Sequence, residues 1–308
     1  MNRDDVAMMA RVKNEERWIS RCLERTWSVA KTAVIWDDGS VDRTETLCAV
    51  SAMPDMAKLA EDAGNLWVPL DCVEPMPFGW IARGNGPEGV RELHFLRTPF
   101  AKFVRPKQRI NEIRDKNMLW YYLKASVAFK HVLCLDGDEM LSQEAIRDFP
   151  SAIQMLETRF DILNIPVIYY WDSEDRIRVD GIYSNGGDGL PQLRFPRLFT
   201  IARVSDDRLF NMCFQWFGTK GGFHCGSIPR QEFRTDNGTP EGSDPSTGLF
   251  RAPIVHFGYI DDPLRRRKFE FYNTIDPNNE FEGGYRHIIG EPNCHAPGPV
   301  QLRDWSDL

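Results

Sequence analysis

An apolar run that ends in a cluster of acids constrains the fold of this chain most. Residues 131–140, HVLCLDGDEM, predict a short buried strand that is followed by Asp136, Asp138 and Glu139 around Gly137. Side chains two apart on an extended chain point to the same side, so Asp136 and Asp138 can aim together at one ligand. In a parallel sheet, ligands gather beyond the carboxyl ends of the strands. The stretch therefore predicts a parallel sheet with a charged site at this strand end.

Apolar runs and helical patterns alternate along the chain in a way that favours an α/β fold. Short apolar runs are typical of buried strands, whereas apolar residues three or four apart indicate helices that cover a sheet. Asn14 and Ser40 are candidate N-caps of the first two helices. We predict a mainly parallel sheet flanked by helices. The predicted strands are Asp5–Val12, Ala33–Trp36, Leu66–Cys72 and Asp161–Trp171, and the predicted helices are the segment from Asn14 to Trp27, Val41–Ala49, Gln108–Lys130, Ser142–Glu157 and Pro263–Ile275.

Two segments interrupt this alternation. Glu74–Val90 is rich in Pro and Gly and predicts a loop or an insertion. Thr235–Gly248 has almost no apolar residue and predicts a mobile segment that orders over a bound ligand. Within the first segment, residues 84–89 (GNGPEG) match the spacing G-x-G-x-x-G, but no helical pattern follows them closely, which argues against a dinucleotide site.

Composition and charge narrow the class of protein. The chain has 308 residues, a net charge of −7 and 42% hydrophobic residues, values typical of a globular enzyme without a global basic field for nucleic acid. Its apolar stretches are shorter than the roughly 20 residues that an integral membrane segment needs, and we expect none. The seven cysteines form no C-x-x-C pair, which favours reduced thiols and a cytoplasmic location over disulfides.

The paired acids of the opening stretch suit a hard divalent cation. Asp136 and Asp138 offer two oxygen ligands and leave room for water and phosphate, as Mg²⁺ and Mn²⁺ prefer. Such an ion would neutralise a pyrophosphate as a leaving group, and Gly137 would let a diphosphate approach the backbone. An EF-hand is excluded because the sixth and twelfth positions from Asp136 hold Leu141 and Arg147. The alternative is an acidic turn that caps the next helix.

Three motifs together resemble one known family. ARVKNEE (10–16), IWDDGSVDRT (35–44) and LCLDGDEML (133–141) stand in the order and spacing of the family-2 glycosyltransferases, which have the glycosyltransferase-A fold. The resemblance spans roughly residues 5–145. It implies a Rossmann-like half, residues 1–145, that binds a nucleotide-sugar donor, a UDP-sugar first among them. It also implies an acceptor-binding half, residues 146–308, in the same compact domain.

The resemblance also implies roles for particular residues. Asp136 would meet the ribose and share with Asp138 the binding of Mn²⁺ or Mg²⁺. His256 resembles a C-terminal histidine that closes over the metal or the diphosphate, although a histidine with a purely structural role fits equally well. The remaining nucleotide-sugar-binding candidates are Arg11, Asn14, Asp37 and Asp38, with Arg114 and Asn117 near the diphosphate.

The second half resembles the family less closely. FPRLFTIARV (195–204) is similar to the segment that leads to the acceptor side, but His224 is followed by Cys225 where related enzymes carry glutamate. An inverting enzyme needs a base on the acceptor side, and Asp172, Glu174 and Asp175 are the candidates. A retaining enzyme would need none, and an exposed acidic turn is the structural alternative.

The sequence leaves several alternatives for the identity of the acceptor. A cell-envelope glycan is the commonest acceptor in this family. A 5-hydroxymethylated pyrimidine in DNA, as in phage-type enzymes, would make use of the RRRK run at residues 265–268, although the net charge of −7 disfavours strong DNA binding. An inactive glycan-binding module is a third alternative, which the complete set of metal carboxylates disfavours.

Overall fold

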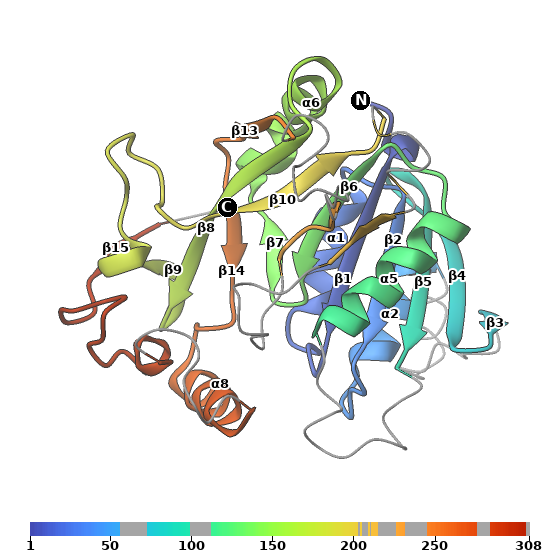
Figure 1. Cartoon of the computed structure of the whole chain (residues 1–308). Helices are drawn as coiled ribbons and strands as arrows, with labels where there is room; N and C mark the ends of the chain where they lie inside the picture. The colour runs from blue at the N-terminus through green and yellow to red at the C-terminus, as the bar shows by residue number, and fades with distance from the viewer. Residues whose placement is uncertain are drawn as a thin grey trace, which may run out of the picture.

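Four parallel strands form the centre of the sheet in the computed structural model of the chain (Figure 1). They lie in the spatial order β6 (His131–Asp136), β1 (Val6–Val12), β2 (Thr32–Asp37) and β5 (Gly89–Arg97). The residues that the structure describes are 1–55, 73–98, 112–202, 204, 209, 211–214, 226–231, 245–275 and 284–305.

Helices cover both faces of this parallel centre, which is why its strands are apolar almost throughout. On one face, Met8 of β1 packs in the same core as Leu23 of α1 (Ile19–Trp27) and Ala49 of α2 (Thr44–Ala52). On the other face, Met9 packs with Trp120 of α5 (Glu112–Ser126). Successive β1 side chains therefore enter different cores, as the period of a strand requires.

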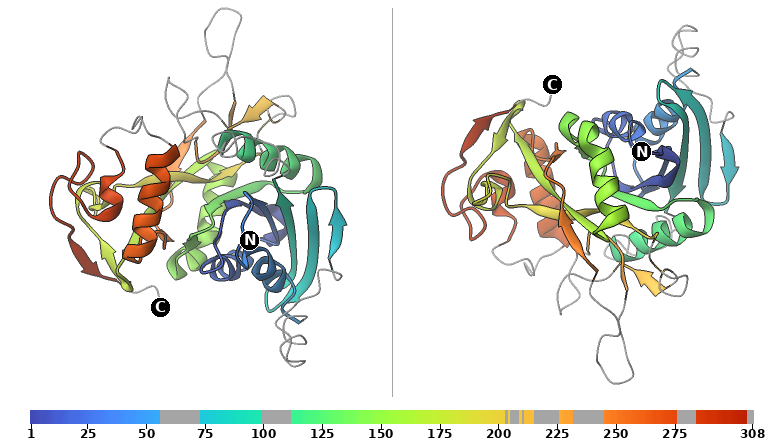
Figure 2. Two further views of the ribbon diagram at one scale, coloured as in Figure 1. Left: turned by 90° about the horizontal axis from the view of Figure 1, so that it is seen from below. Right: turned by 90° about the horizontal axis from the view of Figure 1, so that it is seen from above.

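Antiparallel strands extend the sheet on both sides. Next to β6 come β10 (Arg194–Thr200), β8 (Ile162–Trp171), β9 (Ser173–Arg178) and β15 (Leu302–Asp304), and next to β5 come β4 (Gly79–Gly86) and β3 (Glu74–Met76). β13 (Thr247–Leu249) and β14 (Ile254–His256) run parallel to β8, and β7 (Glu139–Leu141) pairs with β14. The views of Figure 2 show the N-terminal strands and the C-terminal segments on opposite sides of the molecule.

The remaining described elements lie around this sheet. α6 follows β7, and α8 follows β14 at the end that carries the acidic motif (Figure 1). Among the described residues, no helix is long and apolar enough to span a membrane. The bounds are α6 (Gln143–Thr158), α8 (Asp262–Ile275), β11 (Met212–Cys213), β12 (Arg230–Gln231) and the 3-10 helices η1 (Arg3–Asp5), η4 (Gly181–Tyr183) and η5 (Arg286–Ile289).

The predicted fold class, a mainly parallel sheet at the N-terminal half flanked by helices, is confirmed, but the prediction of a loop over Glu74–Val90 is wrong. That segment forms β3, β4 and the start of β5, with a tight turn between the paired Gly86 and Gly89. Trp80 and Ala82 of β4 are buried, and a side chain at Gly79 or Gly84 would overlap the backbone of neighbouring segments. These two glycines allow close approach within a strand, and they do not mark a loop.

Two predicted helix caps are also wrong. The first helix begins after Trp18, and Asn14 has a positive φ of 57° in the turn before it. The second helix begins after Arg43, three residues beyond Ser40. The predicted strand Leu66–Cys72 and residues 235–244 of the polar segment lie outside the described residues.

Candidate functional site

The strand register brings the acidic motifs to one edge of the sheet. Arg11 of β1 pairs with Asp136 of β6, and the next residue of β1, Val12, pairs with Asp37 of β2. Asp136 and Asp37 therefore stand at nearly the same level, with β1 between them. This placement confirms the expectation that both acidic strand ends face the same edge, and it keeps Asp37 away from the partners of Asp136.

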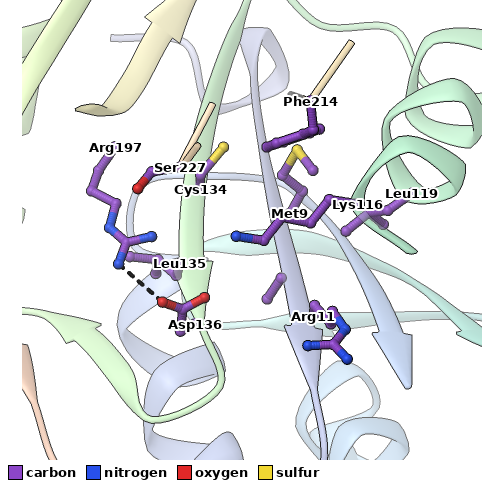
Figure 3. A pocket seen from close by; sticks show the side chains of 11 residues that line it. Met9, Arg11, Lys116, Leu119, Cys134, Leu135, Asp136, Arg197, Phe214 and Ser227 are labelled. Atoms are coloured by element: carbon purple, nitrogen blue, oxygen red, sulfur yellow. Dashed lines mark hydrogen bonds and ion pairs between the residues drawn. The ribbon is translucent and has the colours of Figure 1, made fainter. Parts of the chain in front are cut away.

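A small pocket opens at this edge between β1, β6, β10 and α5 (Figure 3). Three cationic side chains, Arg11, Lys116 and Arg197, line it together with the carboxylate of Asp136. Its walls are completed by Met9, Ala10, Leu119, Cys134, Leu135, Phe214 and Ser227. Lys116 also pairs with Glu112 of α5 at 2.7 Å. The lining itself holds three cations and one carboxylate, and this excess of cations suits an anionic ligand.

Arg197 holds the acidic motif from the neighbouring strand β10. Its guanidinium lies 3.0 Å from Asp136 Oδ2 and 2.5 Å from Glu139 Oε1, and Glu139 is almost fully buried. Burial alone would raise the pKa of Asp136, but Arg197 and Lys116 outweigh it and lower that pKa. Burial and the nearby Asp136 raise the pKa of Glu139 to about 7. Asp136 therefore stays ionised across the neutral range.

Strand β14 brings His256 to the second acid of the motif. The N–H of Phe257 donates to the Asp138 carbonyl at 2.9 Å, and His256 Nε2 lies 3.6 Å from Asp138 Oδ2. The same Oδ2 atom accepts a hydrogen bond from Lys268 Nζ of α8 at 2.5 Å. Burial would raise the pKa of Asp138, but His256 and Lys268 lower it. Asp138 is thus already paired with a cation that the chain itself supplies.

These contacts bear on the expected metal site. His256 Nδ1 accepts a hydrogen bond from the Gly258 N–H at 3.0 Å, and burial lowers the histidine pKa to about 4, so the neutral ring carries its proton on Nε2. A protonated Nε2 has no lone pair for a metal. With Lys268 on Asp138, the described residues form no group of three metal-ligating side chains. The carboxylates suit Mg²⁺ or Mn²⁺ by chemistry, but as they lie they do not fit the ion.

The nucleotide-side candidates form a second group of ion pairs. Arg11 lies 2.7 Å from Asp38 Oδ2 and 3.4 Å from Asp115 Oδ2, and Arg114 pairs with the same Asp115 at 2.7 Å. Asp115 is fully buried, and it pairs with Arg11, which lines the pocket, as well as with Arg114. Asp37 accepts hydrogen bonds from the Ser40 backbone and side chain, and burial raises its pKa.

The two asparagines among the candidates make structural hydrogen bonds. Asn14 Oδ1 accepts from the Val41 N–H at 2.9 Å, and the Asn14 N–H donates to Ser40 Oγ at 2.8 Å, which ties the turn after β1 to the turn after β2. The Phe214 N–H donates to Asn117 Oδ1 at 2.6 Å, and Asn117 Nδ2 donates to the Phe214 carbonyl at 3.1 Å. Asn117 therefore fixes Phe214, which lines the pocket, and Asn14 joins two turns beyond the strand ends.

The candidate bases lie at the turn between β8 and β9. Asp172, which has a positive φ of 67°, pairs with Arg265 of α8 at 3.0 Å. Glu174 pairs with Arg21 at 2.8 Å, and Asp175 accepts a hydrogen bond from Ser173. Each candidate is partly exposed and already has a partner. The partners of Asp172 and Asp138, Arg265 and Lys268, are three residues apart on α8.

Several site residues were not singled out from the sequence. Arg197 lies within FPRLFTIARV and Lys268 within RRRK, but no local signal assigns either one to the acidic motif. Glu15 is another: its side chain packs against Gly137, where an added Cβ would lie 2.6 Å from Glu15 Cγ. Glu15 and Val12 therefore occupy the Cβ side of Gly137, and the expectation that a diphosphate approaches the Gly137 backbone stays a prediction.

No family model matches the chain, and no curated protein matches it. Among solved structures, the chain is similar to Staphylococcus aureus TarS residues 1–349, with 12% identity and a TM-score of 0.39, over 93% of this chain and 69% of that one. It is also similar to the glucosyl-3-phosphoglycerate synthase of Mycobacterium tuberculosis in complex with Mn²⁺ and UDP-glucose, with 16% identity and a TM-score of 0.26, over 53% of this chain and 43% of that one. Similarity at this level assigns no activity to the chain.

Proposed function

We propose that the chain is a glycosyltransferase that moves a sugar from a nucleotide-sugar donor, a UDP-sugar first among them, to an acceptor hydroxyl. The observation that carries the proposal is the pocket at the carboxyl ends of β1 and β6. There Arg11, Lys116 and Arg197 surround Asp136. A departing nucleoside diphosphate carries the negative charge that such a group of cations stabilises.

The arrangement supports specific roles along the donor. Arg11 and Arg114, fixed by Asp38 and Asp115, would stand at the nucleotide side. Asp37 would accept hydrogen bonds from the base. Asp136 would accept a hydrogen bond from a ribose hydroxyl, because its lowered pKa keeps it an acceptor at neutral pH. Asn117 acts in this proposal by holding Phe214 in the pocket wall, and Asn14 by joining the turns after β1 and β2.

Binding of Mn²⁺ or Mg²⁺ by Asp136, Asp138 and His256 stays a prediction. When bound, such an ion would supply charge neutralisation of the diphosphate. Its binding requires that Lys268 leave Asp138 and that His256 expose a lone pair.

A base for the acceptor hydroxyl would come from the turn between β8 and β9. Asp172 is the candidate with a link to the metal motif, since its partner Arg265 shares α8 with Lys268. Glu174 and Asp175 remain candidates. For any of them, the present partner must be exchanged for the acceptor hydroxyl before proton transfer.

For the acceptor, we retain a cell-envelope glycan as the first proposal. The alternative of a hydroxymethylated DNA base drew on the RRRK run as a phosphate-binding patch. In the structure, Arg265 pairs with Asp172, Arg266 with Asp262 and Lys268 with Asp138. These partners within the chain weaken that argument for DNA. A cytoplasmic location is likewise retained as a prediction.

The proposal is tested by donor hydrolysis, followed as release of nucleoside diphosphate from a panel of nucleotide sugars. We expect one donor to be turned over by the wild-type chain and by Asp148→Asn, an exposed control on α6. Asp136→Asn should lose most of this activity. No release from any donor would refute the proposal and leave the inactive glycan-binding module as the better alternative. Equal release by the wild type and Asp136→Asn would refute the role of the pocket around Asp136.

A further inference from the structure

Lys268 occupies the position on Asp138 that a metal ion would need. Its ammonium group lies 2.5 Å from Asp138 Oδ2, the atom that also faces His256. The Asp138 side chain is only 6% exposed, so few directions of approach to its oxygens remain. A lysine ammonium is a compact cation with three donors, and it competes directly with a divalent ion for a carboxylate lone pair.

The surrounding residues are built around this contact. A Cβ added to Gly258 would overlap Asp138 Oδ2, Lys268 Nζ and His256 Cε1. The three polar groups therefore meet against a bare stretch of backbone, and a larger residue at 258 would force them apart. The close packing indicates that the contact is part of the folded structure and that it is more than a chance surface pair.

Acidic side chains gather around this contact. Asp136, Asp138 and Glu139 follow one another closely in the chain, and Glu15 packs against Gly137 between the first two. The chain supplies a cation of its own, Lys268, beside these acids.

The helix that carries Lys268 is anchored independently of Asp138. Arg265, one turn earlier, pairs with Asp172 at 3.0 Å, donates to the Tyr259 carbonyl at 2.8 Å and stacks 4.2 Å from the Trp171 ring. The backbone of α8 can therefore stay in place while the flexible lysine side chain swings away. Lys268 Nζ also lies 5.6 Å from the Tyr259 ring.

We propose that Lys268 is an internal counter-cation that occupies the place of a divalent ion on Asp138, so that the residues around Asp138 do not take up such an ion as they stand. Lysine and metal exclude each other on one carboxylate oxygen, because both positive charges would stand within a few ångströms of one another in a poorly hydrated site.

One consequence follows for binding. The wild-type chain binds Mn²⁺ weakly, because the ion must displace an ammonium that is already paired with Asp138.

The test is calorimetric titration of Mn²⁺ alone, with no nucleotide and no turnover, into the wild-type chain and four variants. Lys268→Met removes the competing charge and should tighten Mn²⁺ binding by about tenfold. Lys268→Gln, which keeps a polar side chain, serves as a second charge-removing variant if Lys268→Met folds poorly. Lys268→Arg keeps the charge and should bind Mn²⁺ as weakly as the wild type. Arg267→Met is the matched control, because it removes the same charge from an exposed neighbouring residue of α8.

Tighter Mn²⁺ binding in the Lys268→Met or Lys268→Gln variant, with Arg267→Met unchanged, supports the proposal. Equal or weaker binding in the charge-removing variants overturns it. The result with Mn²⁺ alone does not depend on nucleotide binding or on donor turnover, so it stands whether or not the proposed function fails.

Discussion

The two groups of ion pairs at the ligand-binding edge are built from different parts of the chain. The nucleotide-side group, Arg11, Asp38, Arg114 and Asp115, draws only on β1, the end of β2 and α5. The motif group joins Asp136, Asp138 and Glu139 to partners from β10, β14 and α8, up to 130 residues further along the chain.

This difference separates what each group needs in order to form. The nucleotide-side group is complete once the parallel N-terminal half has folded. The motif group is incomplete until β10 has paired with β6 and β14 has paired with β7 and β8. The acceptor half therefore does more than receive the acceptor, because it supplies every cation that contacts the acids of the motif directly in the described structure.

The largest expected effect concerns Arg197. Replacing it in Arg197→Met leaves Glu139 and Asp136 without their shared cation in a buried site, which should lower the free energy of unfolding by about 3–5 kcal/mol. Urea unfolding followed by circular dichroism measures this loss. Arg194→Met is the control on the same strand, since Arg194 pairs with an exposed acid, and we expect it to change stability very little. Equal losses of unfolding free energy in Arg197→Met and Arg194→Met would contradict the expectation that the buried ion pair stabilises the chain more than the exposed one.

The next effect concerns pH and His256. Burial lowers the folded-state pKa of His256 to about 4, below the ordinary value of 6.5, so the unfolded chain takes up this proton first as pH falls. His256 therefore contributes stability above pH 6.5 that is lost as pH falls towards 4, by up to about 3 kcal/mol. The difference in unfolding free energy between pH 7 and pH 4 should be smaller in His256→Gln. If the difference between pH 7 and pH 4 were the same in His256→Gln as in the wild type, the fold would not hold the His256 ring in its neutral form.

The parallel half was accessible to sequence reasoning because its signals are local. β1, β2, β6 and α6 were predicted within a few residues, since each has a periodic apolar pattern of its own. The hairpin of β4 and β5 was missed because its glycines serve close backbone contacts that only the neighbouring strands reveal. The partners of the acidic motif were missed for a related reason: nothing near Arg197 or Lys268 in the sequence specifies a contact with a residue 60 to 130 positions away.

A smaller effect is expected on the nucleotide side. If Asp37 accepts hydrogen bonds from the base, Asp37→Ala should weaken binding of a nucleoside diphosphate by about 1.5–3 kcal/mol, with or without metal. Because Asp37 also accepts from Ser40, the thermal unfolding of the variant must be measured alongside the calorimetric titration. Unchanged affinity of a folded variant for the nucleoside diphosphate would show that the nucleotide base does not bind at Asp37.

The smallest structural effect is expected at the turn between β8 and β9. Glu174 forms a half-exposed pair with Arg21, so Glu174→Gln should change stability by less than about 1 kcal/mol. If Glu174 is the base, the same variant should lose transfer activity and keep nucleotide affinity. Asp172→Asn and Asp175→Asn, assayed in parallel, identify which of the three acids the reaction needs.

The most direct test of the account is whether the cationic pocket binds a diphosphate. Lys116→Met removes one positive charge from the pocket, and Lys130→Met removes one from an exposed residue outside it. Calorimetric titrations would compare UDP, GDP and ADP with the corresponding nucleosides. The account predicts that one diphosphate binds the wild type and Lys130→Met equally, binds Lys116→Met at least about tenfold more weakly, and exceeds its nucleoside in affinity. Equal binding of that diphosphate by Lys116→Met, or no binding of any diphosphate to the wild type, would contradict it.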